Sequence, residues 1–341
     1  MSNYDFVAKR KREQHLFIVE GNHEKDKLLN LLLQCFPEMN IKSENIIVYE
    51  TNIYMLYSRL ISEYGEEWAE TDVDLPYLVS KMKNSEVVWN KRNFINIFLI
   101  FDYERQDPYF SEADINKMQQ YFINETDNGK LYINYPMVES YCDSFDSQEE
   151  PFELKKVMLP FKTGREYKNR TEKSKIARAV NFPQKLDSIL KGSFDIKNSD
   201  IRANCIRQLL DLKESGLLID DIEKILNGCI DKEYLETAKN LIKDKIIKVG
   251  YTELKSSYIE FMRKMICEII RYNIRKANLI QNEKYDVQED KLKDVLYELD
   301  PIKILDEQNK CSKDMQNGFI WVLNTSVLIV PDYSFRLLEN D

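Results

Sequence analysis

Two short apolar runs in the N-terminal half of the chain end directly on carboxylates. Residues 15–19 run into Glu20, and residues 97–101 run into Asp102 and Glu104. In a parallel α/β sheet the carboxyl ends of the strands open onto one crevice, so acids from two strands can share a site. Neighbouring carboxylates repel one another unless a cation lies between them, and Mg²⁺ prefers such oxygen ligands. Phosphate-ester chemistry with Mg²⁺ or Mn²⁺ is therefore the first hypothesis.

The spacing of these acids resembles the TOPRIM domain, in which a Glu follows a first strand and an Asp-x-Asp motif follows a later one. Here the second motif reads Asp-Tyr-Glu, so Glu104 keeps the charge but reaches one methylene further. Residues 20–24, Glu-Gly-Asn-His-Glu, look like the Glu-Gly-x-x-Glu form of TOPRIM proteins in bacterial anti-phage systems. Residues 134–141 are similar to the Asn-Pro…Glu segment of the RloB-like and PARIS-effector groups, with Glu139 as the acid. Together these motifs cover about the first 145 residues, and residues 321–326 resemble the end of such effectors.

In the functional interpretation each acid has a role. Glu20 would be a metal ligand or the general base that orients water, Asp102 the principal Mg²⁺ ligand, and Glu104 the holder of a second ion or of a bound water. Glu24 could join the site or only place negative charge at a helix N-terminus. Glu139 has the same two interpretations, and the resemblance favours a position at the border of the site.

A strongly basic segment interrupts a chain whose net charge is −9. Residues 155–185 contain ten basic and two acidic residues. The candidates for contacts with substrate phosphates are Lys162, Arg165, Lys168 and Arg170, while the aromatic residues Phe161, Tyr167 and Phe182 could stack on bases. The alternative is a solvated or mobile surface segment with no ligand.

Hydrophobic periodicity divides the chain near residue 150. Before it, strands alternate with amphipathic helices, which predicts βα units in an α/β parallel-sheet core over residues 1–150. The motif resemblance implies that this core is a TOPRIM-like (Rossmann-like) domain. The expected strands are 15–20, 46–49, 95–101 and 131–134, and the expected helices are 25–36, 52–63, 74–82 and one that starts at Ser111. After it, residues 151–341 predict a basic linker segment and a mainly helical module, with helices over 201–218, 221–226, 234–248 and 254–279. Residues 325–330 favour a terminal strand that could return to the core.

Several classes of protein are disfavoured by what the sequence lacks. The six cysteines form no C-x-x-C pair, so neither a zinc knuckle nor a disulfide framework is indicated. No apolar run approaches the roughly 20 residues that span a bilayer, and no signal peptide is recognisable, so we expect a cytoplasmic protein with no membrane partner. There is no G-x-x-x-x-G-K-[ST] motif, so any ATP would have to be used by a partner.

The leading hypothesis is a metal-dependent TOPRIM-type nuclease that cuts tRNA, another RNA or DNA. The resemblance implies a toxic anti-phage effector that is held or triggered by a partner ABC-type ATPase. The alternative is a catalytically silent TOPRIM-like scaffold, whose helical module docks a partner or forms a homodimer. A primase-like or topoisomerase-like activity would use the same kind of metal site. Topoisomerases also need a nucleophilic tyrosine on a further domain, and no stretch of the chain resembles that domain.

Overall fold

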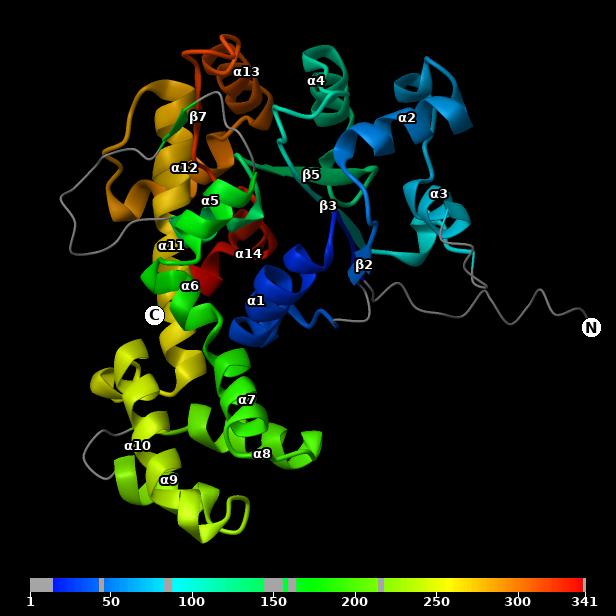
Figure 1. Ribbon diagram of the computed structural model, residues 1–341. Helices are drawn as coiled ribbons and strands as arrows, with labels where there is room; N and C mark the ends of the chain where they lie inside the picture. Colours follow the sequence, from blue (N-terminus) through cyan, green and yellow to red (C-terminus); the bar gives the residue numbers. More distant parts are fainter. Residues whose placement is uncertain are drawn as a thin grey trace, which may run out of the picture.

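A parallel β-sheet forms the centre of the N-terminal part of the molecule (Figure 1). The computed structural model describes residues 15–42, 46–82, 88–143, 156–158, 164–213 and 218–339. The sheet contains β1 (His15–Val19), β2 (Ile46–Val48), β3 (Asn96–Asp102), β4 (Ile123–Asn124) and β5 (Gly129–Asn134), in the order β2-β1-β3-β5-β4. All neighbours pair in parallel except β4 and β5, which are antiparallel. The predicted α/β class with a mostly parallel sheet is confirmed.

The helices that follow the strands begin where the sequence indicates. After β1, a π-helical stretch η2 (Glu24–Leu29) continues directly as α1 (Asn30–Cys35). α2 (Ile53–Tyr64) starts after Asn52, whose side chain accepts a hydrogen bond from the Met55 amide at 3.0 Å. α3 (Leu75–Met82) follows, and α4 (Glu112–Tyr121) begins after the predicted N-cap Ser111, which accepts from the Asp114 amide at 3.3 Å. Both caps satisfy amides that the first helical turn leaves without an intrahelical partner.

Helices cover the sheet on both faces, as the continuous apolar character of β3 requires. Phe98 and Ile100 face a hydrophobic core that includes residues of α1 and of α11 (Tyr258–Asn282). Leu99 and Phe101 face a second core that includes residues of α2 and α4. In Figure 1 the long α11 runs from the level of the sheet to the lower, purely helical part of the molecule.

The chain after residue 150 is mainly helical, as predicted. Its helices, apart from α11, are α5 (Gly164–Thr171), α6 (Lys175–Val180), α7 (Phe182–Gly192), α8 (Ser199–Leu210), α9 (Leu218–Leu226), α10 (Lys232–Val249), α12 (Leu292–Glu298), α13 (Pro301–Cys311) and α14 (Ile329–Tyr333). Within the predicted helix over 201–218, α8 ends at Leu210, and residues 214–217 lie outside the described residues. Ser257 begins α11 with a capping box in which Glu260 is the reciprocal partner.

The predicted terminal strand at 325–330 is wrong. Residues 326–328 form a 3₁₀ turn that leads into α14, because the side chain of Asn324 accepts from the Val327 amide at 3.1 Å and Thr325 Oγ1 donates to the Ile133 carbonyl at 2.9 Å. These hydrogen bonds outweigh the β propensity of the residues that follow. The strand lies earlier, in β7 (Phe319–Trp321), which pairs with β6 (Lys156–Met158) in a separate two-stranded sheet.

The segment after β7 does return to the main core. Tyr135 and Leu323 exchange backbone hydrogen bonds of 2.8 and 2.9 Å just beyond the end of β5. Both hydrophobic cores contain residues from before and after residue 150. The two parts of the chain thus share their hydrophobic cores. The division into two domains near residue 150 stays a prediction.

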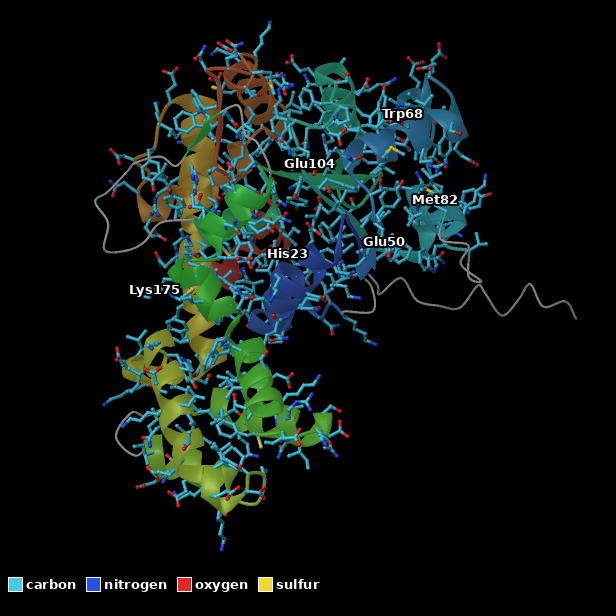
Figure 2. All side chains as sticks on the ribbon, in the orientation of Figure 1. His23, Glu50, Trp68, Met82, Glu104 and Lys175 are labelled. Carbon is cyan, nitrogen blue, oxygen red and sulfur yellow. The ribbon has the colours of Figure 1, made fainter. Side chains whose placement is uncertain are left out.

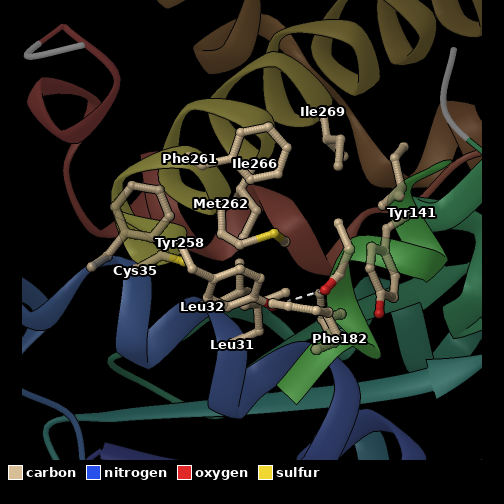
Figure 3. Close-up of a cluster of buried hydrophobic side chains, with 14 of the residues drawn as sticks. Leu31, Leu32, Cys35, Tyr141, Phe182, Tyr258, Phe261, Met262, Ile266 and Ile269 are labelled. Atoms are coloured by element: carbon tan, nitrogen blue, oxygen red, sulfur yellow. Dashed lines mark hydrogen bonds between the residues drawn. The ribbon is translucent and has the colours of Figure 1, made fainter. Parts of the chain in front are cut away.

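The contact between α1 and α11 is the clearest example of this shared core. Figure 3 shows Leu31 and Leu32 of α1 against Tyr258 and Met262 of α11, with Phe182 beside them. Tyr258 also donates a hydrogen bond of 2.9 Å to the carbonyl of Ala179, which connects α11 to α6. The first βα unit is thus fixed in place by the helical module.

Within the described ranges, no helix has the length and apolar character needed to cross a bilayer.

Removing the Met262 side chain should destabilise the whole fold. Met262 is fully buried between α1 and α11, so Met262→Ala should lower the free energy of unfolding by about 2–5 kcal/mol in urea denaturation. Lys264→Ala, an exposed change on the same helix, is the matched control and should cost less than about 0.5 kcal/mol. Equal effects of the two changes would contradict the packing described here.

Candidate active site

The acidic motifs that follow β1 and β3 meet at one edge of the sheet. β1 and β3 are parallel neighbours with Val19 opposite Ile100, so Glu20 follows β1 where Asp102 ends β3. The two acids are in contact, since a carboxylate oxygen of Glu20 accepts a hydrogen bond from the Asp102 amide at 3.3 Å. The convergence expected from the sequence is therefore present in the fold.

In the Asp-Tyr-Glu motif, the central Tyr103 is buried in the core, while the two acids lie at the pocket. Tyr103 is fully buried in the core beneath the motif, and its hydroxyl donates to the side chain of Asn309 at 2.7 Å. Because successive side chains of an extended strand point to opposite sides, Asp102, the last residue of β3, presents its carboxylate on the side away from this anchor. Glu104 lies beyond the strand, in the turn that follows. Both acids border one pocket.

Asp102 is buried at the end of β3. Its exposed fraction is 7%, and its Oδ1 accepts a hydrogen bond of 2.8 Å from the Val138 amide. Burial raises the pKa of Asp102 well above its ordinary value, and the negative charges of Glu20 and Glu24 raise it further. A single backbone donor does not compensate for this loss of solvation, so the ionised form has a strong need for positive charge.

Glu20 and Glu24 belong to the same electrostatic cluster. Burial raises the pKa of Glu20 well above its usual range, and repulsion from Glu104 and Glu24 adds to this effect. Glu24 is also buried, and burial raises its pKa although the Gly21 amide donates to its carboxylate at 2.7 Å. The two roles predicted for Glu24 were a place in the site and a negative charge at a helix N-terminus. In the structure Glu24 borders the pocket and also lies in the first turn of η2.

Glu104 occupies an unusual backbone conformation. Its φ angle is +39°, in the left-handed region that costs non-glycine residues about 1–2 kcal/mol. Asn52, the N-cap of α2, donates to Glu104 at 3.4 Å and to Asp107 at 2.7 Å, and so helps to hold this turn. Burial raises the pKa of Glu104. Sequence reasoning identified Asn52 only as the start of a helix; its contact with the acidic motif depends on tertiary structure.

Glu139 lies beside the pocket, on the turn that leaves β5. Its side chain is 6% exposed, and its Oε1 lies 3.3 Å from His23 Nε2 and 3.1 Å from Lys168 Nζ. Neither contact has hydrogen-bond geometry, and Oε2 of Glu139 has no hydrogen-bond partner among the described residues. A buried carboxylate with an oxygen free of hydrogen bonds is costly unless a ligand completes it. The sequence alone indicated that His23 was a turn residue rather than part of this contact.

Hydrogen bonds from residues 324 and 326 hold the turn that carries Glu139. Asn324 donates to the carbonyl of Val138 at 2.8 Å and to the hydroxyl of Ser140 at 3.1 Å. Ser326 donates to the side chain of Asn134, at the end of β5, at 2.8 Å. Asn324 and Ser326 are fully buried, and a buried polar network with its hydrogen bonds satisfied favours one rigid arrangement of the backbone. It fixes the backbone amide of Val138, which is the donor to Asp102.

Of the four predicted phosphate-binding cations, the structure brings Lys168 to the pocket. Burial lowers the pKa of Lys168, but the charges of Glu139, Asp102 and Glu24 outweigh this effect and leave the pKa raised. Arg170 forms an ion pair with Asp143 instead and does not line the pocket. Lys162 and the side chain of Arg165 lie outside the described residues.

The predicted role of aromatic side chains in base stacking is wrong for two of the three residues. Tyr167 is 2% exposed and Phe182 is 3% exposed, since both pack into hydrophobic clusters. Phe161 lies outside the described residues. Helical periodicity in the basic segment was the signal that could have shown these rings to be core positions.

The pocket itself is an open depression at the carboxyl ends of the strands, with a volume of about 440 Å³. Figure 2 marks two residues of its wall, His23 near the start of the first helix and Glu104 beyond the end of β3. The complete lining is Glu20, Gly21, Asn22, His23, Glu24, Asp102, Glu104, Gln106, Met137 and Lys168. Four carboxylates thus face one cation, and this imbalance defines the chemistry of the site.

The donor set suits a hard divalent cation, although its atoms are not gathered around one point. In the described part of the chain, no three His, Cys, Asp or Glu side chains stand close enough together to hold a metal ion as they are placed. Burial raises the pKa values of Glu20, Asp102 and Glu104, and repulsion from neighbouring carboxylates raises those of Glu20 and Asp102 further. Oxygen-rich acidic sites that keep room for water and substrate are typical of Mg²⁺. The residues therefore fit Mg²⁺ or Mn²⁺ by charge and donor type.

In the absence of metal, this cluster should make the protein less stable as the pH rises. A carboxylate whose pKa is raised by folding stabilises the protein below its unfolded pKa, near 4, and this contribution is lost as the pH rises through the folded pKa. Asp102→Asn keeps an acceptor for the Val138 amide but removes the charge. In EDTA at pH 7 we expect it to raise the free energy of unfolding by an amount on the order of 1 kcal/mol.

Urea denaturation between pH 4.5 and 8 measures this effect, with the exposed change Glu67→Gln as the control. The wild type should lose more stability across this range than Asp102→Asn. A variant that is less stable than the wild type at pH 7 would contradict the electrostatic description of the cluster.

Comparison of the chain with protein-family models, with curated proteins and with solved structures found no match in any of the three.

Proposed function

We propose that this protein is a metal-dependent nuclease of TOPRIM type, which hydrolyses phosphodiester bonds in nucleic acid. The observation that carries the proposal is the convergence of Glu20, Glu24, Asp102 and Glu104, with Lys168, on one pocket at the carboxyl ends of β1 and β3. Acids from two strands with one facing cation suit a substrate that brings a phosphate to a metal ion. The motifs that resemble TOPRIM proteins supply the same residues independently of this geometry.

Within this proposal, Asp102 and Glu20 would hold the ion, and Glu104 would hold a second ion or a water. When bound, Mg²⁺ or Mn²⁺ supplies Lewis acidity to the phosphate and lowers the pKa of bound water. Lys168, which also lines the pocket, would meet a phosphate oxygen, and Glu139 Oε1 lies 3.1 Å from its ammonium group. Glu24 would complete the acidic wall while it accepts from the Gly21 amide.

The substrate class and the setting rest on the resemblance. We propose RNA such as tRNA, or DNA, as the target, and a toxic role in anti-phage defence under the control of a partner ABC-type ATPase, with a cytoplasmic location. The local excess of basic residues in 155–185 favours a nucleic-acid partner, because the rest of the chain is acidic.

A catalytically silent scaffold is the second candidate, and two observations favour it. The described residues contain no ready-made metal cluster, and Asp102 and Glu24 each accept a backbone hydrogen bond, which gives them a structural role. In that case the helical module would dock a partner or a second copy of the chain. The two candidates differ in what the acids do, so substitution of the acids separates them.

Cleavage of tRNA and of plasmid DNA by the purified full-length protein in Mg²⁺ or Mn²⁺ tests the proposal. Glu20→Gln and Asp102→Asn should each reduce the rate at least about 100-fold, since each removes a charge that the reacting phosphate and its metal require. Glu67→Gln, an exposed carboxylate away from the pocket, should leave the rate within about twofold.

Lys168→Ala should reduce cleavage at least about tenfold, while Lys175→Ala, which removes an exposed cation of the same basic segment, should have little effect (Figure 2 labels Lys175). Where purified protein needs a trigger to act, toxicity on expression in cells replaces the cleavage assay. Equal toxicity of the wild type and the Glu20→Gln variant would favour the scaffold.

A further inference from the structure

Two thiols lie in contact in the helical module, away from the acidic pocket. Cys205 is in α8, and Cys229 is in the turn that follows α9. Their sulfur atoms are 3.5 Å apart, and both lie near the carbonyl of Ile225, at 4.0 and 3.9 Å. Neither residue is used by the proposed nuclease function.

The surrounding backbone allows the two sulfurs to come closer. A disulfide requires an S–S distance of about 2.05 Å, so the pair must close by about 1.5 Å. Cys205 is fixed in a helix, but Cys229 follows Gly228, which has a φ angle of +88° and thus ends α9 in a left-handed turn. A turn residue can adjust its position at less cost than a residue inside a helix. The approach of the sulfurs therefore needs movement of one turn rather than of two helices.

We propose that Cys205 and Cys229 form a reversible disulfide when the protein meets a peroxide, and so are a redox modification site. The Cys229 thiol is first oxidised by hydrogen peroxide to a sulfenic acid, with release of one water. The sulfur of Cys205 then attacks the Cys229 sulfur, and the hydroxyl leaves as a second water with the Cys205 proton. A dithiol reductant returns both thiols.

The order of events follows from exposure. Cys229 is partly exposed, whereas Cys205 is buried, so the oxidant reaches Cys229 first. Burial raises the pKa of Cys205 to about 12, and the nearby Cys229 thiol adds to this effect. Burial and the raised pKa therefore limit the reaction of Cys205 with solvent oxidants. The raised pKa also slows its attack on the sulfenic acid, but the 3.5 Å separation of the sulfurs makes this attack intramolecular and so favours it over reaction with any thiol in solution. The bond would connect α8 to the C-terminal end of α9.

Peptide mapping of the intact chain tests the proposal. Reduced protein is treated with hydrogen peroxide, alkylated and digested without reductant. We expect a peptide that joins Cys205 to Cys229, and its loss after dithiothreitol. Cys311, which is partly exposed and hydrogen-bonded to Glu307 at 3.3 Å, serves as an internal control for oxidation. Oxidation of Cys311 with no joined peptide would overturn the proposal.

Two variants test the order of the reaction. In Cys205→Ala the sulfenic acid at Cys229 has no resolving thiol, so dimedone should label Cys229 several-fold more than in the wild type. In Cys229→Ser no joined peptide should form, and Cys205 should stay reduced. Equal dimedone labelling of Cys229 in the wild type and in Cys205→Ala would overturn the mechanism. If Cys205→Ala does not fold, the comparison between wild type and Cys229→Ser decides alone, because Cys229 is partly exposed and the change to Ser keeps its size.

The oxidised wild type should also exchange its amide protons in α9 at least about tenfold more slowly than the reduced form, because the bond restricts local opening. Oxidised Cys229→Ser should show no such change. An exchange rate in α9 that is unaltered by oxidation of the wild type would contradict a cross-link between these elements.

Discussion

The parallel pairing of β1 with β3 is the constraint on which the site depends. Neighbouring strands lie about 4.8 Å apart, so a register with Val19 opposite Ile100 fixes the backbones of Glu20 and Asp102 close together. Their burial and mutual repulsion raise both pKa values, and the backbone amides of Asp102 and Val138 relieve only part of the cost. A fold that holds such acids together without a cation gives up stability. We therefore interpret the cluster as built for a positively charged ligand.

The rest of the molecule supports this edge of the sheet. Asn324 holds the turn that carries the Val138 amide and Glu139, while Tyr103 fixes the backbone between Asp102 and Glu104. The contact between α1 and α11 holds the helix that follows Glu20 (Figure 3). The C-terminal half of the chain thus helps to position the residues of the site.

Local patterns predicted the individual strands, and the positions of the acids at their ends, because an apolar run and the residue that follows it are visible within a few neighbouring residues. Apolar runs identified β1 and β3, and Ser111 was recognised as an N-cap. The parts that failed depend on distant partners. Residues 326–330 are helical because hydrogen bonds from Thr325 to Ile133 and within the turn fix the backbone there. Tyr167 and Phe182 are buried by packing, and Arg170 is paired with Asp143. Neither His23 beside Glu139 nor Asn52 beside Glu104 has a signature in the sequence alone.

Binding of Mn²⁺ to the full-length protein at pH 7, measured by isothermal titration calorimetry, tests the central claim most directly. The account predicts saturable binding to the wild type and a loss of at least about tenfold in affinity for Asp102→Asn, with Glu67→Gln unchanged. Binding that is absent from the wild type, or equal in wild type and Asp102→Asn, would contradict the claim that these acids form a cation site.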